Sequence, residues 1–297
     1  MKSSYENVKL TTYPEKSCRS HNSRIKTDSG YFHYYEYPMM LHGSLQNIMG
    51  TRFDILIIDK SKPESEYLWS ETVSELHRLD KMMNRFDPLS EISIINRDAS
   101  DNPIRVTSEM WSVLQSCRQY YLQTLGLFDI TLKDFSKVGF AWQDKSIYFS
   151  QPGLSLDLGG YAKGYALKKI KQYLVNAGVQ HCFVDFGNSS VLGMGHHPYG
   201  DAWKISIVNP FNPGENLNEI SLRDEALSVS GNTPTYTGHI VRPASGESIK
   251  ERKIISITSK DPLEAEILST AFMMAGREEK KNLSENFKIK NIIEYSL

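Results

Sequence analysis

The sequence predicts an α+β fold in which mixed sheets pack against helices. Apolar residues recur at helical spacing in segments near 63–83, 108–126, 162–174 and 261–275. Residues 203–257 instead read mostly as short strands separated by turns. Helical and strand segments do not alternate in a strict βαβ repeat, which favours α+β over a doubly wound sheet.

The composition is that of an ordinary globular chain. The 297 residues are 40% hydrophobic and 23% charged, with a net charge of -1. A balanced charge gives no overall field that would favour nucleic acid or an anionic membrane, and no apolar run approaches a membrane span. The start shows neither an apolar signal segment nor a lipid-attachment pattern around Cys18. The three cysteines are far apart, so we expect a cytoplasmic location.

The first half of the domain begins after a polar, tyrosine-rich segment. We expect residues 1–40 to form a loosely structured arm, and 41–297 to form the domain. Met49–Ile58 predicts a strand. Pro63 begins a helix that ends before Phe86-Asp87-Pro88, and its apolar face comprises Leu68, Leu76, Leu79 and Met83. A short segment at 91–96 follows. The next helix begins at Thr107 or Ser108 and stops at Gly126.

The second half contains a strand-to-helix turn. Leu154–Leu158 predicts a short strand, and a helix follows Gly159-Gly160 and ends before Gly178. Further strands are expected at 181–186, 204–208, 221–223 and 253–258. Asp261 and Pro262 give a strong helix start, and Gly276 closes that helix after about Ala275.

The glycine-rich turn Leu158–Gly164 is the first candidate site. N–H groups at a helix N-terminus are unpaired, glycines permit close approach of a phosphate, and Lys163 adds a positive charge. The segment matches neither the dinucleotide motif nor the P-loop. A tight turn that needs glycine only for packing explains it equally well.

Two residues of the last predicted helix form the second candidate site. Glu266 and Thr270 are four residues apart and share a face, where their oxygens suit a hard cation such as Mg²⁺. The alternative is a solvated acidic first turn that complements the helix dipole.

Three other features are candidates with equally plain alternatives. Asp129 lies between apolar residues, where it either accepts a ligand N–H or caps a local turn. Residues 228–232 are small, which suits either close approach of a ligand or an ordinary loop. His239 lies downstream and is either a catalytic residue or a structural one. Phe86 is either a core residue or a stacking platform for a planar ring.

Taken together and in this order, these segments resemble the ApbE family, the FAD:protein FMN transferases. The resemblance covers about Met49 to Gly276. The matching segments are MGTRF at 49–53, RFDPLSEISIIN at 85–96, GLFDIT at 126–131, DLGGYAKGYA at 157–166, VDFGNSSVLGMG at 184–195, VSGN at 229–232, GHIVRPASG at 238–246 and AEILSTAFMMAG at 265–276. The resemblance implies an ApbE-like, T-fold-related α+β fold.

The resemblance also implies an activity. Family members bind FAD and a divalent cation, usually Mg²⁺, and transfer FMN to a threonine or serine hydroxyl of a target flavoprotein, releasing AMP. Matching positions make Gly160, Glu266 and Thr270 metal ligands. The positions that match FAD contacts are Met49, Phe86, Leu127, Phe128, Asp129, Asp157, Lys163 and Ile240.

The chain departs from the family pattern at several positions. Glu266 replaces the usual aspartate and must fold back to ligate a metal, and Val229 replaces a threonine. Arg242 and Lys168 stand where aspartates are common. Two other hypotheses therefore stay open, a flavin-binding protein without transferase activity and a Mg²⁺-dependent FAD pyrophosphatase.

Overall fold

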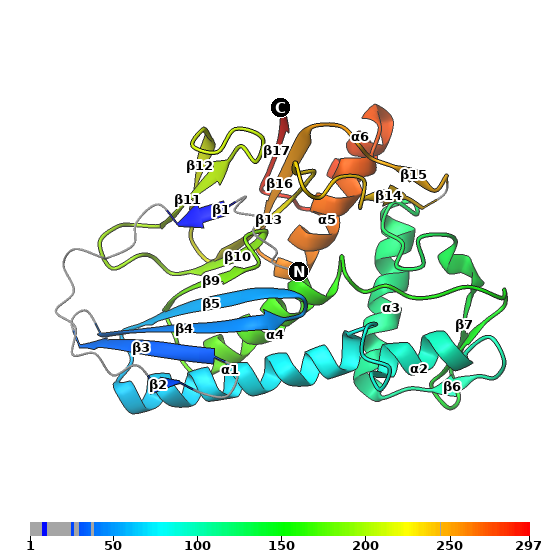
Figure 1. Cartoon of the computed structure of the whole chain (residues 1–297), viewed down its shortest axis with the longest axis horizontal. Helices are drawn as coiled ribbons and strands as arrows, with labels where there is room; N and C mark the ends of the chain where they lie inside the picture. Colours follow the sequence, from blue (N-terminus) through cyan, green and yellow to red (C-terminus); the bar gives the residue numbers. More distant parts are fainter. Residues whose placement is uncertain (1–7, 11–24, 27–29, 37–38, 244) are drawn as a thin grey trace.

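The computed structural model describes residues 8–10, 25–26, 30–36, 39–243 and 245–297. It confirms the mixed α+β fold. A nine-stranded sheet, antiparallel at every pair, forms its centre (Figure 1). In spatial order its strands are β17 (Asn291–Ser296), β16 (Lys253–Ser259), β13 (Glu225–Gly231), β10 (Ser190–Met194), β9 (His181–Phe186), β5 (Thr51–Ile58), β4 (Met39–Ile48), β3 (Gly30–Glu36) and β2 (Ile25–Lys26).

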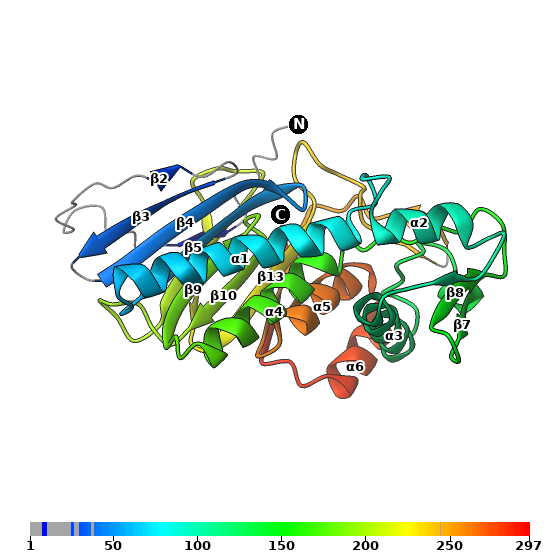
Figure 2. The same ribbon diagram turned by 90° about the horizontal axis from the view of Figure 1, so that it is seen from below.

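Three helices cover one face of this sheet. They are α1 (Lys62–Met83), α4 (Ala162–Asn176) and α5 (Pro262–Met274), seen side by side in Figure 2. Helix α5 is buried on nearly all sides, with only Glu264 and Thr270 partly exposed. A helix that is apolar all round belongs in the core. The side chains that interrupt its apolar surface therefore need polar partners inside the protein.

A small sheet covers the opposite face. It comprises β1 (Val8–Leu10), β11 (Trp203–Val208) and β12 (Asn216–Leu222). The apolar residues of β11 and β12 pack with those of β5, β9 and β13 in a second core. Because neighbouring side chains of a strand point to opposite faces, β13 divides its residues between the two layers. Leu227 and Val229 lie in this second core, whereas Ser228 and Ser230 contact α5.

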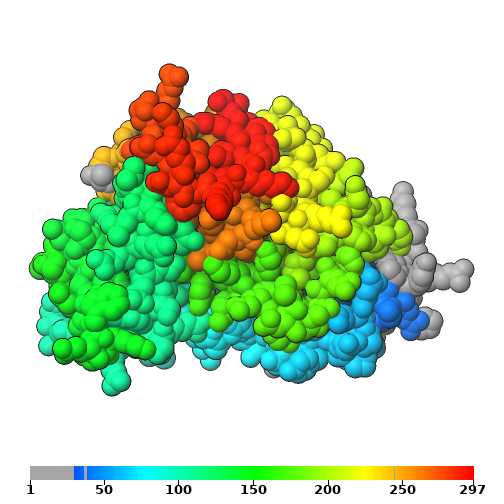
Figure 3. Space-filling view, turned by 180° about the vertical axis from the view of Figure 1, so that it is seen from behind, coloured from blue at the N-terminus to red at the C-terminus, as the bar shows by residue number. Residues whose placement is uncertain are grey.

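The remaining elements lie at one end of the central sheet. They include α2 (Glu91–Asp98), α3 (Ser108–Gln123), the 3₁₀ turn Phe135–Lys137 and a sheet of β6 (Ile104–Arg105), β8 (Ser146–Phe149) and β7 (Val138–Ala141). Helix α6 (Arg277–Asn286) and the pair β14 (Val241–Arg242) and β15 (Glu247–Ser248) complete the fold. Figure 3 shows the segment around α3 against the C-terminal segment, where Tyr120 stacks on Phe287 at 6.2 Å.

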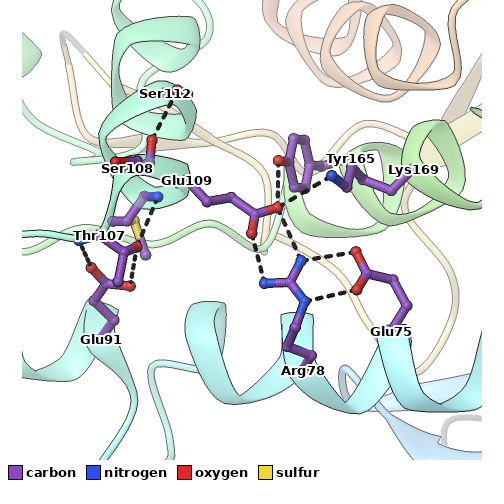
Figure 4. Close-up of polar contacts among 10 residues, drawn as sticks. Glu75, Arg78, Glu91, Thr107, Ser108, Glu109, Ser112, Tyr165 and Lys169 are labelled. Carbon is purple, nitrogen blue, oxygen red and sulfur yellow. Dashed lines mark hydrogen bonds and ion pairs between the residues drawn. The ribbon is translucent and has the colours of Figure 1, made fainter.

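A polar network joins α1, α3 and α4 beneath the sheet. Arg78 pairs with Glu75 on its own helix and with Glu109 at the start of α3, at 2.7 and 2.6 Å (Figure 4). Tyr165 of α4 donates to the same Glu109 carboxylate at 2.9 Å, and Lys169 lies 3.6 Å from it. One carboxylate thus fixes three helices against one another, including the helix that begins at the glycine turn.

The structure confirms most predicted elements and corrects two. Residues 30–36, expected in a loosely structured arm, form β3 and pair along their whole length with β4. The expected division at residue 40 stays a prediction, and residues 1–7 and 11–24 lie outside the described part of the chain. Leu154–Leu158 is not a strand. The backbone of Leu156 bonds to the side-chain amide of Asn96 instead. The amide donates to the Leu156 carbonyl at 2.9 Å and accepts from the Leu156 N–H at 2.6 Å.

Candidate functional site

The Glu266 carboxylate is the centre of a buried polar cluster. Its side chain comes from α5, and the residue is only 5% exposed. Oε1 contacts the Lys163 ammonium of α4. Oε2 accepts from the hydroxyls of Ser190 on β10 and Ser228 on β13, the latter at 3.0 Å. Four elements therefore meet at one carboxylate, and the buried charge is both paired and hydrogen-bonded, as burial requires.

A row of hydroxyls continues from this carboxylate along α5. The Ser269 hydroxyl lies 3.0 Å from that of Ser228 and 2.7 Å from that of Ser230, and donates to the Glu266 carbonyl at 3.0 Å. Thr270 lies at the end of the row, 3.5 Å from Ser230. The sequence reasoning missed Ser190, and treated 228–232 as small residues rather than hydroxyl donors. The alternation of Ser228 and Ser230 in a strand was the signal that could have found them.

The glycine turn lies against Thr270. The position that a Cβ on Gly160 would occupy is 3.9 Å from Thr270 Oγ1 and 3.9 Å from the Phe128 ring. Within the described residues, the Gly160 carbonyl accepts no hydrogen bond, so its lone pairs are open to another partner. The structure thus places Gly160 beside Thr270, whose hydroxyl donates to the Glu266 backbone carbonyl at 3.3 Å. That the three residues ligate one metal stays a prediction.

Gly164 is needed for packing, as expected if the turn requires glycine only to fit closely. A Cβ there would lie 2.7 Å from Glu266 Cβ and 3.0 Å from Leu263 Cα. Only glycine allows α4 to approach α5 this closely. The close approach also lets Lys163 reach Glu266, so the packing explanation is confirmed and ligand binding at the same turn stays a prediction.

The positive charge of Lys163 sits at the N-terminus of α4. The helix begins at Ala162, so Lys163 lies in the first turn, where unpaired N–H groups and the helix dipole attract anions. A cation is unfavourable there unless a negative charge lies nearby. Glu266 supplies that charge within the protein, and a phosphate group would supply it from a ligand.

The donor set fits a hard divalent cation. It consists of one carboxylate, one hydroxyl and one carbonyl, and Mg²⁺ prefers oxygen ligands and retains positions for water and substrate phosphates. A carboxylate oxygen offers about two lone-pair positions. At Oε2 of Glu266, both lone-pair positions accept serine hydroxyls, whereas at Oε1 one position accepts from Lys163. No cluster of three or more His, Cys, Asp or Glu side chains offers an alternative metal site in the described ranges.

Arg85 links two predicted flavin contacts, Phe86 and Asp157, near the glycine turn. Arg85 is 3.4 Å from Asp157 and lies over the Phe86 ring at 4.8 Å. Asp157 also accepts from the Gly159 N–H at 2.9 Å, directly before Gly160. Phe86 is 82% exposed, which excludes the core alternative and leaves its ring available for stacking. Met49 lies at the first position of the tight β4–β5 turn, with φ 46°.

Other predicted contacts are buried around the turn. Leu127 and Phe128 are buried, and Leu127 packs with Ile240 and α5 in the same apolar cluster. Asp129 accepts from the N–H and hydroxyl of Thr131, both at 2.7 Å, and from the Phe135 N–H at 2.9 Å. The turn-capping alternative for Asp129 is therefore confirmed, and its contact with FAD stays a prediction. Desolvation raises the pKa of this carboxyl, although these hydrogen bonds oppose the shift.

Among the described residues, His239 makes no contact with the Glu266 cluster. Its exposed ring stacks on Tyr236 at 4.0 Å in the loop between β13 and β14. Desolvation by the surrounding protein atoms lowers the pKa of His239. Its catalytic role stays a prediction.

Three departures from the family pattern have structural partners outside the cluster. Val229 faces the second core, on the side of β13 away from α5. Arg242 donates to the Met274 carbonyl at 2.6 Å and pairs with Glu279, so it caps the C-terminus of α5. Lys168 pairs with Asp261 at the other end of α5, at 2.6 Å. Of the four substitutions, only Glu266 belongs to the cluster.

Comparisons with known proteins identify the family of this chain. The model of the ApbE family matches residues 49–146 and 135–293. An FAD:protein FMN transferase of Vibrio cholerae is 24% identical over 268 residues, covering 77% of this chain and 80% of that protein. The solved flavin transferase ApbE from Vibrio cholerae superposes with a TM-score of 0.74 at 22% identity, covering 86% of this chain and 96% of the other. The Pseudomonas stutzeri flavinyl transferase ApbE gives 0.72 at 20% identity, covering 92% and 96%. With matches over most of its length, the chain belongs to the ApbE family.

Proposed function

We propose that this chain is an FAD:protein FMN transferase. The observation that carries the proposal is that Gly160 lies beside Thr270 and Lys163 contacts Glu266, although 103 residues separate Lys163 from Glu266. The turn supplies an anion-attracting helix end, and α5 supplies oxygen ligands. A pyrophosphate bound together with a divalent cation fits both the helix end and the oxygen ligands.

The proposed reaction moves the FMN half of FAD. An acceptor threonine or serine oxygen bonds to the phosphorus of the FMN half, the phosphoric anhydride bond to AMP breaks, and the hydroxyl proton leaves. Mg²⁺, when bound by Glu266, Thr270 and the Gly160 carbonyl, would offset charge that develops on the departing AMP. Lys163 and the α4 N-terminus would orient the pyrophosphate. His239, which lies apart from the Glu266 cluster in this structure, is the residue that we propose as the proton acceptor, and this role depends on its approach to the acceptor hydroxyl in the complex.

The decisive experiment combines the chain with FAD, Mg²⁺ and a flavoprotein whose acceptor threonine is unmodified. We expect a fluorescent flavin band that survives denaturing electrophoresis, together with one AMP for each flavin transferred. Glu266→Gln should abolish the band. Glu264→Gln is the matched control, because Glu264 lies in the same helix but its partner is the hydroxyl of Ser259, at 2.8 Å. Equal transfer by wild type and Glu266→Gln would refute the role of the carboxylate.

The same mixture separates the alternatives. Release of FMN and AMP without any acceptor would identify an FAD pyrophosphatase, with water in place of the hydroxyl. Tight FAD binding with neither AMP release nor covalent flavin, across several acceptors, would identify a non-catalytic flavin-binding protein. The structure favours transfer over the second outcome because Val229, Arg242 and Lys168 have structural partners elsewhere.

A further inference from the structure

The Lys163 ammonium contacts the one Glu266 oxygen that has room for a cation. Oε2 is occupied by the hydroxyls of Ser190 and Ser228, so any additional ligand of this carboxylate must approach Oε1. Lys163 already contacts Oε1. A divalent cation placed on the same oxygen would lie within a few ångströms of the ammonium, in a cluster that is largely buried, where like charges repel strongly.

We propose that Lys163 and the divalent cation compete for Oε1 of Glu266, so that cation binding releases the ammonium toward the phosphates of FAD. This proposal rests on the proposed function of the site. Lys163 would keep one internal partner after release, because its Nζ also donates to Ser190 Oγ at 3.1 Å. Its place in the first turn of α4 keeps it beside the N–H groups where a phosphate would bind.

Competition of this kind makes the two ligands cooperative. The cation removes the carboxylate partner of Lys163, and a phosphate replaces that partner. Conversely, FAD that attracts Lys163 leaves Oε1 open to the cation. Because coupling between two ligands is reciprocal, each should tighten the binding of the other by the same factor. The Lys163 side chain would then make the cation and FAD bind together rather than singly.

The test measures cation affinity without any transfer reaction. Lys163→Met removes the ammonium and keeps the length of the side chain. We expect this variant, without FAD, to bind Mn²⁺ by isothermal titration about tenfold more tightly than wild type, within the usual range of coupling between sites. FAD affinity, followed by flavin fluorescence, should rise on adding Mg²⁺ in wild type. In Lys163→Met that rise should be smaller, because only the direct attraction between the cation and the phosphates remains.

Two further variants keep the result interpretable. Lys168→Met removes a nearby lysine of α4 whose partner is Asp261, and both affinities should remain unchanged. Lys163→Gln retains a hydrogen-bond donor without the charge. If Lys163→Met does not fold, Lys163→Gln should show the tighter Mn²⁺ binding. Mn²⁺ affinity in the folded Lys163 variants that is equal to or below that of wild type would overturn the competition. Flavin transfer by wild type is scored separately, so failure of one proposal does not decide the other.

Discussion

The Ser228 hydroxyl donates to Oε2 of Glu266 at 3.0 Å and lies equally close to the hydroxyl of Ser269. One side chain of β13 therefore orients two residues of α5. Ser228→Ala would remove one hydrogen bond from each of two buried groups that keep other partners, and we expect the free energy of unfolding in urea to fall by about 1–2 kcal/mol. Mn²⁺ affinity should fall as well, because the carboxylate loses one of its anchors.

Ser256→Ala is the matched control for that variant. Ser256 lies on the neighbouring strand β16, and its buried hydroxyl has no hydrogen-bond partner among the residues that the structure describes. Its removal should leave stability unchanged or slightly higher, and Mn²⁺ affinity unaltered. Equal losses of stability in the two variants would show that the Ser228 hydrogen bonds contribute nothing specific.

Gly164→Ala should separate α4 from α5. The new methyl would lie 2.7 Å from Glu266 Cβ and 3.0 Å from the Pro262 carbonyl oxygen, so the helices must move apart. Overpacking of this kind costs about 1–3 kcal/mol. Thermal melting should show the loss, and Mn²⁺ titration should show weaker binding because Glu266 shifts. At Gly200 the nearest atom would lie 3.7 Å from an added Cβ, so Gly200→Ala should change neither measurement.

Arg242→Met should loosen the end of α5. The guanidinium donates to the Met274 carbonyl at 2.6 Å and pairs with Glu279, joining α5 to α6. Loss of these charge-assisted bonds should lower the free energy of unfolding by about 1–2 kcal/mol. Arg97→Met removes an exposed pair with Asp98 and should have little effect. Full transferase activity of folded Arg242→Met would support a purely structural role, whereas lost FAD binding at unchanged stability would contradict it.

Asp185 should make stability depend on pH. Its side chain is 15% exposed, and burial raises the pKa to about 6, although Arg52 at 2.8 Å opposes the shift. Since the folded-state pKa lies above the ordinary value of 3.8, the stabilising contribution is complete below about pH 3.8 and is lost as pH rises through about 6. Between pH 5 and 7.5 the loss amounts to about 1 kcal/mol.

Asp185→Asn removes this titration. The free energy of unfolding of the variant, measured in urea at several pH values, should fall less than that of wild type as pH rises from 5 to 7.5. The comparison uses the slope with pH, so a constant cost from the altered Arg52 contact does not affect it. Parallel pH profiles for the two proteins would show that Asp185 does not titrate in this range.

Local sequence signals determined most of the helices and the glycine turn. Asp261 and Pro262 begin α5 as predicted, with the Asp261 side chain accepting from the Leu263 N–H at 3.0 Å. Such signals depend on residues three or four apart, so they are readable from the sequence. The sequence also predicted Gly160, Glu266 and Thr270 as one set, through the order of the family's motifs.

Only the tertiary structure decided what surrounds those residues. Three of its features depend on contacts between distant segments. Val229 faces away from α5, Asn96 takes the place of a strand partner for Leu156, and both Ser190 and Lys163 contact Glu266. Residue spacing along the chain carries no information about which strand becomes the neighbour of which helix. Pairing across the sheet and the close approach of α4 to α5 at Gly164 fix those contacts, and with them the partners of the Glu266 carboxylate.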